Sequence, residues 1–127
     1  MKKMKSNKKV ALITGGAKRI GASICRRLHK ANIDLMIHYR NSAQEALALE
    51  KELNSLRINS ASIIQGDLCN QNVYESLISK SISTFGQLDF LVNNASSYYP
   101  TELGEIDEEN WDDLMASNLK APLFLCQ

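Results

Sequence analysis

Two cationic side chains stand among glycines near the start of the 127-residue chain. The stretch from Thr14 to Gly21 reads T-G-G-A-K-R-I-G and follows the apolar run Val10–Ile13. An apolar run ended by glycines is typical of a buried strand, and an apolar residue at every fourth position from Ile20 predicts a helix. The N–H groups at the start of a helix bind phosphate. The stretch therefore predicts a nucleotide pyrophosphate site formed by Gly15, Lys18, Arg19, Ile20 and Gly21.

This stretch departs from the pattern typical of dinucleotide sites. The fingerprint G-x-G-x-x-G is absent as written, and Arg19 stands where its middle glycine would be expected. Taken alone, the stretch is also compatible with an ordinary strand–turn–helix corner that carries two exposed basic residues. The other strand ends of the chain decide between the two interpretations.

The end of the second predicted strand indicates which nucleotide is bound. An NAD site usually has Asp or Glu there to hold the ribose 2′-hydroxyl. No carboxylate occurs at this strand end, and Arg40 is suited to a 2′-phosphate. The alternative is that Arg40 merely begins a solvated loop. We expect NADPH as the cofactor, bound by His38, Tyr39, Arg40, Asn41 and Ser42.

The elements that must position these residues alternate between strands and helices. Apolar runs predict strands over 10–13, 33–39, 61–65 and 88–92. Helices are predicted over 19–31, after a capping box of Ser42 with Glu45, after Asn70 or Asn72, and from about Asp107. Their buried stripes include Ala46, Leu49, Leu53 and Leu56 in the second helix and Val73, Leu77, Ile78, Ile82 and Phe85 in the third, which Gly86 ends. Pro122 is expected to bend the last helix.

Alternating strands and helices predict an α/β fold with a parallel sheet, whose ligands bind at the carboxyl ends of the strands. The third strand ends at Gly66-Asp67-Leu68, and the fourth is followed by Asn93-Asn94-Ala95. We expect Asp67 to face the adenine and Asn94-Ala95 to pass close to the middle of the cofactor. Leu68 joins these residues as part of the predicted cofactor site.

Composition bounds the function classes. The length fits one domain, and a formal net charge of +1 gives no reason to expect nucleic acid or a membrane as partner. Residues 1–9 are predicted to be a flexible basic tail rather than a signal peptide, because the apolar run after them is too short, and the cytoplasm is the expected compartment. The three cysteines and two histidines lack the spacing of metal ligands, so no metal is expected.

Four segments together resemble the short-chain dehydrogenase/reductase family, and the chain is most similar to its pteridine reductases. Thr14-Gly15…Gly21, Asp67, Asn93-Asn94-Ala95 and Asn118 stand at the family's spacing. The narrower match rests on T-G-G-A-K-R-I-G, H-Y-R-N-S and N-N-A-S-S-Y-Y-P. The resemblance implies a Rossmann-type doubly wound parallel sheet, with residues 10–127 forming the N-terminal part of one NADP-binding domain.

The resemblance also implies NADPH-dependent reduction of a pterin or dihydrofolate ring. By position, Arg19 would contact cofactor phosphate and the pterin, Ser96 would bind near the nicotinamide and the pterin, and Tyr98 would stack on the pterin. Asn118 would hold a water in the catalytic proton relay. Related enzymes are commonly tetramers, so a homo-oligomer is expected.

The family's Tyr-x-x-x-Lys pair does not occur in these 127 residues, since none of the four tyrosines has lysine four positions later. We therefore expect a sheet that is incomplete at its C-terminal side, and a 127-residue polypeptide that lacks normal activity alone. Two alternatives stay open: another short-chain reductase, such as a 3-oxoacyl-carrier-protein reductase, and a non-catalytic NADP-binding module.

Overall fold

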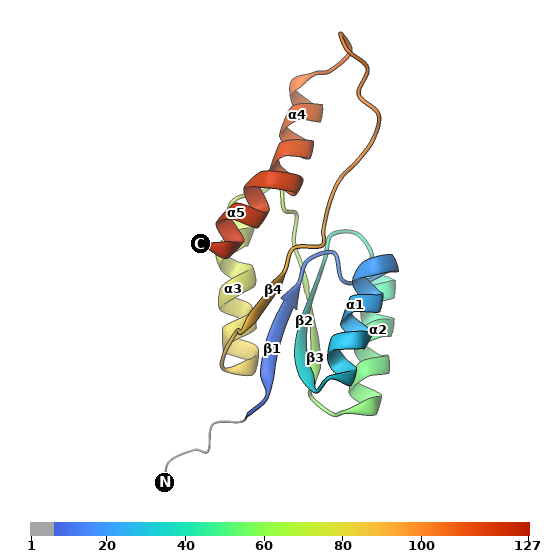
Figure 1. Ribbon diagram of the computed structural model, residues 1–127, viewed down its shortest axis with the longest axis vertical. Coiled ribbons are helices and arrows are strands. Elements are labelled where there is room, and N and C mark those ends of the chain that lie inside the picture. Colours follow the sequence, from blue (N-terminus) through green and yellow to red (C-terminus); the bar gives the residue numbers. More distant parts are fainter. Residues whose placement is uncertain (1–6) are drawn as a thin grey trace.

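Four parallel strands form a single sheet in the computed structural model, which describes residues 7–127 (Figure 1). The strands are β1 (Lys9–Ile13), β2 (Ile33–Tyr39), β3 (Ala61–Gln65) and β4 (Phe90–Val92), in the order β3-β2-β1-β4. The order runs from β1 outward to β3 and then resumes on the other side of β1 with β4. This reversal is the switch point at which doubly wound sheets bind ligands. The predicted α/β fold is confirmed, and β4 forms an edge of an incomplete Rossmann-type sheet.

Helices cover both faces of this sheet. They are α1 (Arg19–Lys30), α2 (Ala43–Leu56), α3 (Asn72–Phe85), α4 (Glu108–Met115) and α5 (Ala121–Cys126), with a π-helical segment, η1 (Ala116–Lys120), between the last two. Because side chains alternate along a strand, Leu35 and Ile37 pack with α1 and α2, whereas Met36 packs with α3 and α5. Figure 1 shows α1 and α2 on one side of the sheet and α3 on the other.

Two element boundaries differ from the sequence prediction. β1 begins at Lys9, inside the predicted tail, where the Lys9 ammonium lies 3.8 Å from the Asp89 carboxylate. Residues 1–6 of that tail lie outside the described residues. β4 begins at Phe90 rather than Leu88, since the ladder with β1 pairs only Ala11–Ile13 with Phe90–Val92.

The predicted capping box before α2 is wrong. Ser42 does occupy the N-cap, but its φ of −91° and ψ of 54° lie outside the extended region from which a cap hydroxyl reaches the helix. Its side chain accepts no cap hydrogen bond. Before α3, Gln71 holds the N-cap position, and the Asn70 side chain accepts from the Asn72 amide at 3.0 Å. The prediction for Gly86 is confirmed, because this residue ends α3 in the left-handed conformation.

Two apolar residues assigned to buried stripes, Leu56 and Ile82, are exposed instead, and so is Ile20, which the spacing places on the apolar face of the first helix. Ile20 is 72% exposed, Leu56 74% and Ile82 45%. In α1 the centre of the buried face lies one position further along the chain than the face that begins at Ile20. Ile24 and Leu28 of that face are partly buried against the core, and the fully buried residues are Gly21, Ala22, Cys25 and His29. The rotation follows from a close approach of Gly21 to the preceding turn, described below.

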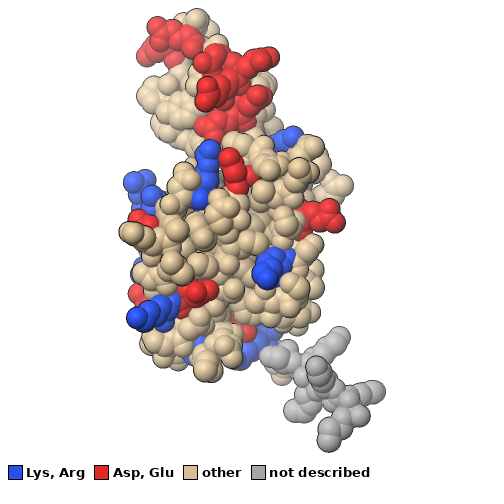
Figure 2. All heavy atoms as spheres, turned by 180° about the vertical axis from the view of Figure 1, so that it is seen from behind, with Lys and Arg blue, Asp and Glu red and all other residues tan. Residues whose placement is uncertain are grey.

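The last helical region departs most from a regular helix. The sequence predicts a bend at Pro122, and the structure has a change of helix type beside it: the widened π turn of η1 ends at Lys120, and Pro122 is the second residue of α5. At the start of α4, Asp107 and Asn110 form a reciprocal capping box. Figure 2 shows acidic side chains gathered over this projecting part of the molecule. Within residues 7–127, none of the helices has the length and apolar character needed to cross a membrane.

Candidate cofactor site

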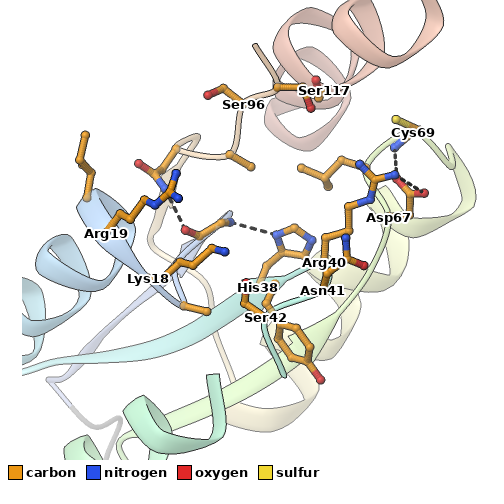
Figure 3. A pocket seen from close by; sticks show the side chains of 18 residues that line it. Lys18, Arg19, His38, Arg40, Asn41, Ser42, Asp67, Cys69, Ser96 and Ser117 are labelled. Atoms are coloured by element: carbon orange, nitrogen blue, oxygen red, sulfur yellow. Dashed lines mark hydrogen bonds and ion pairs between the residues drawn. The ribbon is translucent and has the colours of Figure 1, made fainter. Parts of the chain in front are cut away.

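An open pocket of about 410 Å³ lies at the carboxyl ends of the strands, beside the start of α1. Figure 3 shows Lys18 and Arg19 on one side of it, Arg40 and Asn41 on the other, and His38 between them. Every residue predicted to bind the cofactor lines this pocket except Gly21. The lining consists of Gly15, Ala17, Lys18, Arg19, Ile20, His38, Tyr39, Arg40, Asn41, Ser42, Asp67, Leu68, Cys69, Asn94, Ala95, Ser96, Ser97 and Ser117.

Gly21 does not line the pocket because it is buried against the turn that precedes α1. A Cβ placed on Gly21 would lie 2.2 Å from the Gly15 carbonyl oxygen and 2.7 Å from the Asn94 side-chain nitrogen. Gly15 itself has a φ of +61°, and a Cβ there would lie 3.0 Å from the Ala95 Cα. Glycine at these two positions therefore lets three backbone segments meet, which brings the start of α1 against the ends of β1 and β4.

The start of α1 is electropositive and lacks a side-chain cap. Lys18 holds the N-cap in an extended conformation without a side-chain cap bond, and the first turn contains no acidic residue. Arg19 then has a φ of 55°, a left-handed conformation that costs a non-glycine residue about 1–2 kcal/mol. Both cations are exposed at the pocket. Because the first N–H groups of a helix have no intrahelical partner, this helix end has the donor set that binds phosphate.

Thr14 ties the end of β1 to the segment after β4. Its hydroxyl oxygen accepts from the backbone amides of Asn94, at 3.1 Å, and Ala95, at 3.0 Å. The Asn94 side chain donates in return to the carbonyls of Thr14, at 3.1 Å, and Gly15, at 3.0 Å. Thr14 is 1% exposed, so these bonds replace water contacts that the buried groups have lost. The Asn94 amide nitrogen thus holds the floor of the pocket in place.

His38 joins the glycine turn to the end of β3. Its Nδ1 accepts from the Gly15 amide at 3.1 Å, and its Nε2 lies 2.8 Å from the Gly66 carbonyl oxygen. The side chain therefore carries its proton on Nε2 and donates it to Gly66. Burial lowers the pKa of His38 below its ordinary value, against smaller opposing effects of the Gly66 bond and of Asp67. The imidazole is neutral and fixed in one tautomer.

Arg40 lies across the pocket from α1 and is paired with two carboxylates. Its guanidinium nitrogens lie 3.5 Å from Asp67 and 3.9 Å from Asp113, and about half of its side chain is exposed. Asp67 also accepts from the backbone amide of Cys69 at 2.9 Å. Partial burial together with Asp113 raises the pKa of the Cys69 thiol to about 11. An exposed guanidinium held by two long ion pairs is free to exchange these partners for a phosphate.

The two remaining predicted residues lie away from the pocket lining. The Tyr98 side chain is 89% exposed, in the loop after β4. Asn118 lies in η1 and holds the same loop by two bonds to the Ser97 backbone: its Oδ1 accepts from the amide at 3.2 Å and its Nδ2 donates to the carbonyl at 2.8 Å. Asn118 therefore positions the residues directly after Ser96, whereas Tyr98 is not brought to the pocket.

Four lining residues were absent from the predicted set: Ala17, Cys69, Ser97 and Ser117. Ala17 and Cys69 lie next to predicted residues, so continuity of the two loops could have found them. Ser117 contributes from η1, far along the chain. Its adjacency to Asn118 was the available signal.

Comparison with known proteins gives a consistent assignment. Pteridine reductase 1 of Leishmania tarentolae is 37% identical over an alignment 147 residues long, which covers 91% of this chain and 51% of that protein. The 3-oxoacyl-acyl-carrier-protein reductase FabG of Staphylococcus aureus is 33% identical over 118 residues, 93% of this chain and 47% of that protein. The chain thus spans about half the length of the curated relatives it matches. The family model described as short chain dehydrogenase matches residues 9–127, and the chain belongs to this oxidoreductase family.

Proposed function

We propose that this chain binds NADPH as the cofactor-binding part of a reductase that acts on a pterin or dihydrofolate ring. The observation that carries the NADPH assignment is the pair of cationic groups on opposite sides of one pocket. Lys18 and Arg19 stand at the uncapped start of α1, and Arg40 stands directly after β2, where an NAD site would have a carboxylate. The three negatively charged phosphate groups of NADPH, two in the pyrophosphate and one at the ribose 2′ position, would bind these cationic groups and N–H donors.

Each part of the pocket would have a distinct task. The N–H groups at the start of α1, with Lys18 and Arg19, would hold the pyrophosphate, and Arg40 would leave its carboxylate partners for the 2′-phosphate. Asp67 would then be released to accept a hydrogen bond from the adenine amino group, beside the apolar surface of Leu68. When bound, the nicotinamide supplies hydride. Ala95 and Ser96, which line the pocket after β4, would contact the nicotinamide end of the cofactor.

The substrate class rests on two residues of the pocket and on one relative. Arg19 and Ser96 line the same pocket, on the side of the loop that follows β4. A flat polar ring of the pterin type would use a few fixed polar groups of this kind together with an aromatic face. The aromatic face would come from Tyr98, once the loop after β4 closes over the ligand. The similarity to a protein named pteridine reductase supports this assignment.

A second candidate is reduction of a 3-oxoacyl thioester, favoured by the 33% identity to the 3-oxoacyl-acyl-carrier-protein reductase. A third is cofactor binding without turnover, since the 127 residues contain no Tyr-x-x-x-Lys pair to supply the proton. Titration of the NADPH-loaded chain with dihydrobiopterin and with acetoacetyl thioester separates these candidates. Saturable binding of the pterin alone supports our proposal, binding of the thioester alone contradicts it, and binding of neither by the NADPH-loaded chain favours the non-catalytic module.

The cofactor assignment is tested by Arg40→Gln, with Arg27→Gln on the exposed side of α1 as the matched control. Arg40→Gln removes one charge-assisted contact to the 2′-phosphate, so NADPH affinity should fall roughly tenfold while NADH affinity stays level. Arg27→Gln should change neither. Equal losses of both nucleotides in Arg40→Gln would show that Arg40 does not distinguish them.

We further propose that the protein associates with copies of itself. In the described sheet β4 pairs with β1 on one side alone, so its other edge is open to pairing, and Phe90 on this strand is 47% exposed. Sedimentation at several concentrations tests this. A species that remains a monomer throughout would contradict it.

A further inference from the structure

We propose that His38 is a positioning residue for the dinucleotide turn, and that its Nδ1 decides which backbone amides of that turn face the cofactor. The proposal rests on the proposed function, since it concerns the same pocket. Arg40 and Asp67 beside it are expected to touch the nucleotide, whereas His38 would act on the cofactor through Gly15.

The imidazole is built into the wall of the pocket rather than offered to a ligand. The residue is 2% exposed, and both ring nitrogens are already engaged with backbone, Nδ1 with Gly15 and Nε2 with Gly66. Figure 3 shows the ring at the base of the pocket, with the bond from Gly15 drawn. A buried ring with both nitrogens satisfied has no free group for a phosphate.

His38 binds the turn at two successive amides. While Nδ1 accepts from the Gly15 amide, the backbone carbonyl of the same residue accepts from the Gly16 amide at 2.9 Å. These two N–H groups are therefore directed at β2 and are withdrawn from the ligand. The N–H groups at the start of α1 remain as the donors for the pyrophosphate.

The left-handed conformation of Gly15 makes the side-chain bond consequential. Gly15 has a φ of +61°, and among the described residues its amide donates to His38 Nδ1 alone, while its carbonyl is held by Asn94 and lies next to Gly21. If the amide lost its acceptor, the peptide would have reason to rotate, since a buried N–H without a partner is unfavourable. This amide belongs to the Thr14–Gly15 peptide, so its rotation would turn the Thr14 carbonyl away from Asn94. It would also displace Gly15, against whose carbonyl α1 is seated.

The protonation state agrees with this geometry. Nδ1 can accept a hydrogen bond only while the ring is neutral. If Nδ1 were protonated, its N–H would face the N–H of Gly15, and the bond would be lost. The Asp67 carboxylate after β3 acts on the ring electrostatically, against the effect of burial, and is itself paired with Arg40. Figure 3 shows Lys18 and Arg40 on either side of His38. The lowered pKa of His38, caused mainly by its burial, keeps the ring neutral at physiological pH.

Three variants at this position separate the two ring nitrogens. In His38→Asn, the side-chain oxygen lies about where Nδ1 was and restores an acceptor for Gly15. In His38→Gln, the side-chain nitrogen reaches about as far as Nε2 and restores a donor for Gly66. His38→Ala removes both. Each chain is titrated with NADPH by the fluorescence of the nucleotide, and its thermal midpoint is recorded in the absence of nucleotide.

We expect NADPH affinity to follow the Gly15 contact alone. His38→Ala and His38→Gln should bind NADPH roughly tenfold more weakly than the unchanged chain, whereas His38→Asn should stay within about threefold, as expected for loss or retention of one hydrogen bond at the binding turn. All three should have lowered thermal midpoints, because each disturbs a buried pair. His38→Asn would then lose thermal stability but keep its NADPH affinity, whereas a histidine with a purely structural role would lose both together.

The outcomes distinguish failure of this inference from failure of the proposed function. If the unchanged chain binds no NADPH, the proposed function falls and the inference with it. If the unchanged chain binds NADPH and His38→Asn is as weak as His38→Ala, or if all three variants bind as well as the unchanged chain, the cofactor assignment stands and the role of Nδ1 is refuted.

Discussion

Substitution of Gly21 by alanine should destabilise the fold and weaken cofactor binding together. Alanine in place of glycine inside a helix is ordinarily favourable by about 1 kcal/mol. Here the added Cβ would lie 2.2 Å from the Gly15 carbonyl oxygen, 2.7 Å from the Asn94 side-chain nitrogen and 2.8 Å from the Gly16 Cα. Two of these three contacts are with backbone, so a change of rotamer cannot relieve them.

The size of the effect follows from weighing these contributions. Overpacking of a close-packed interior costs about 1–3 kcal/mol when neighbours can shift. Because the neighbours of Gly21 are the phosphate-site turn and the Thr14–Asn94 network, we place the cost at the upper end. After the helix gain of about 1 kcal/mol is subtracted, the free energy of unfolding should fall by roughly 2 kcal/mol. For a chain of this size that lowers the thermal midpoint by roughly 10 °C.

The assay combines a thermal melt followed by circular dichroism with an NADPH titration. Gly86→Ala is the control, because an added Cβ on Gly86 meets nothing within 4 Å, although Gly86, unlike Gly21, has a positive φ, of 84°. The control should lose stability through backbone strain and keep its NADPH affinity, whereas Gly21→Ala should lose both. A Gly21→Ala chain that melts at or above the original midpoint would refute the close approach of α1 to the turn.

Three further outcomes are expected. Thr14→Val should lower the free energy of unfolding by about 1–3 kcal/mol in a urea titration, since the Ala95 amide loses its acceptor and the Asn94 amide keeps the Val92 carbonyl alone; an unchanged midpoint would refute this. Burial lowers the pKa values of His38 and His29 below the ordinary 6.5, so the unfolded chain takes up protons on these residues before the folded chain does. The free energy of unfolding should therefore be constant above pH 6.5 and fall as the pH is lowered through the folded-state pKa values. A urea midpoint that does not change down to about pH 5 would contradict this. Cys25, buried with its pKa raised to about 12 by burial, should resist a maleimide in the native chain while the other two thiols react, and labelling of all three at equal rates would count against it.

The sequence predicted the order of elements because that order depends on local signals. Apolar runs of strand length located the strands within two residues, and Gly86 located the end of α3. Parallel pairing follows from the alternation of strands and helices, which also brings the strand ends to one edge of the sheet. For this reason the predicted cofactor residues, apart from Gly21, could be gathered from the sequence alone.

Contacts made across the fold could not be predicted in the same way. The rotated face of α1 depends on the fit of Gly21 against Gly15, which no periodicity records. The prediction that Ser42 caps α2 is wrong because the φ and ψ angles of Ser42 do not direct its hydroxyl at the amides of the first turn. The ion pairs of Arg40 and the bridging bonds of His38 join residues of different strands, and only the assembled sheet brings them together.

The most direct test of the account is the ratio of dissociation constants of the chain for NADH and NADPH, measured by fluorescence titration at low and at physiological ionic strength. We expect NADPH to bind at least about tenfold more tightly, since Arg40 adds a contact to the 2′-phosphate. The preference should shrink as added salt screens these charges. Equal affinity for the two nucleotides at both ionic strengths, or tighter binding of NADH, would contradict the assignment of this pocket to NADPH.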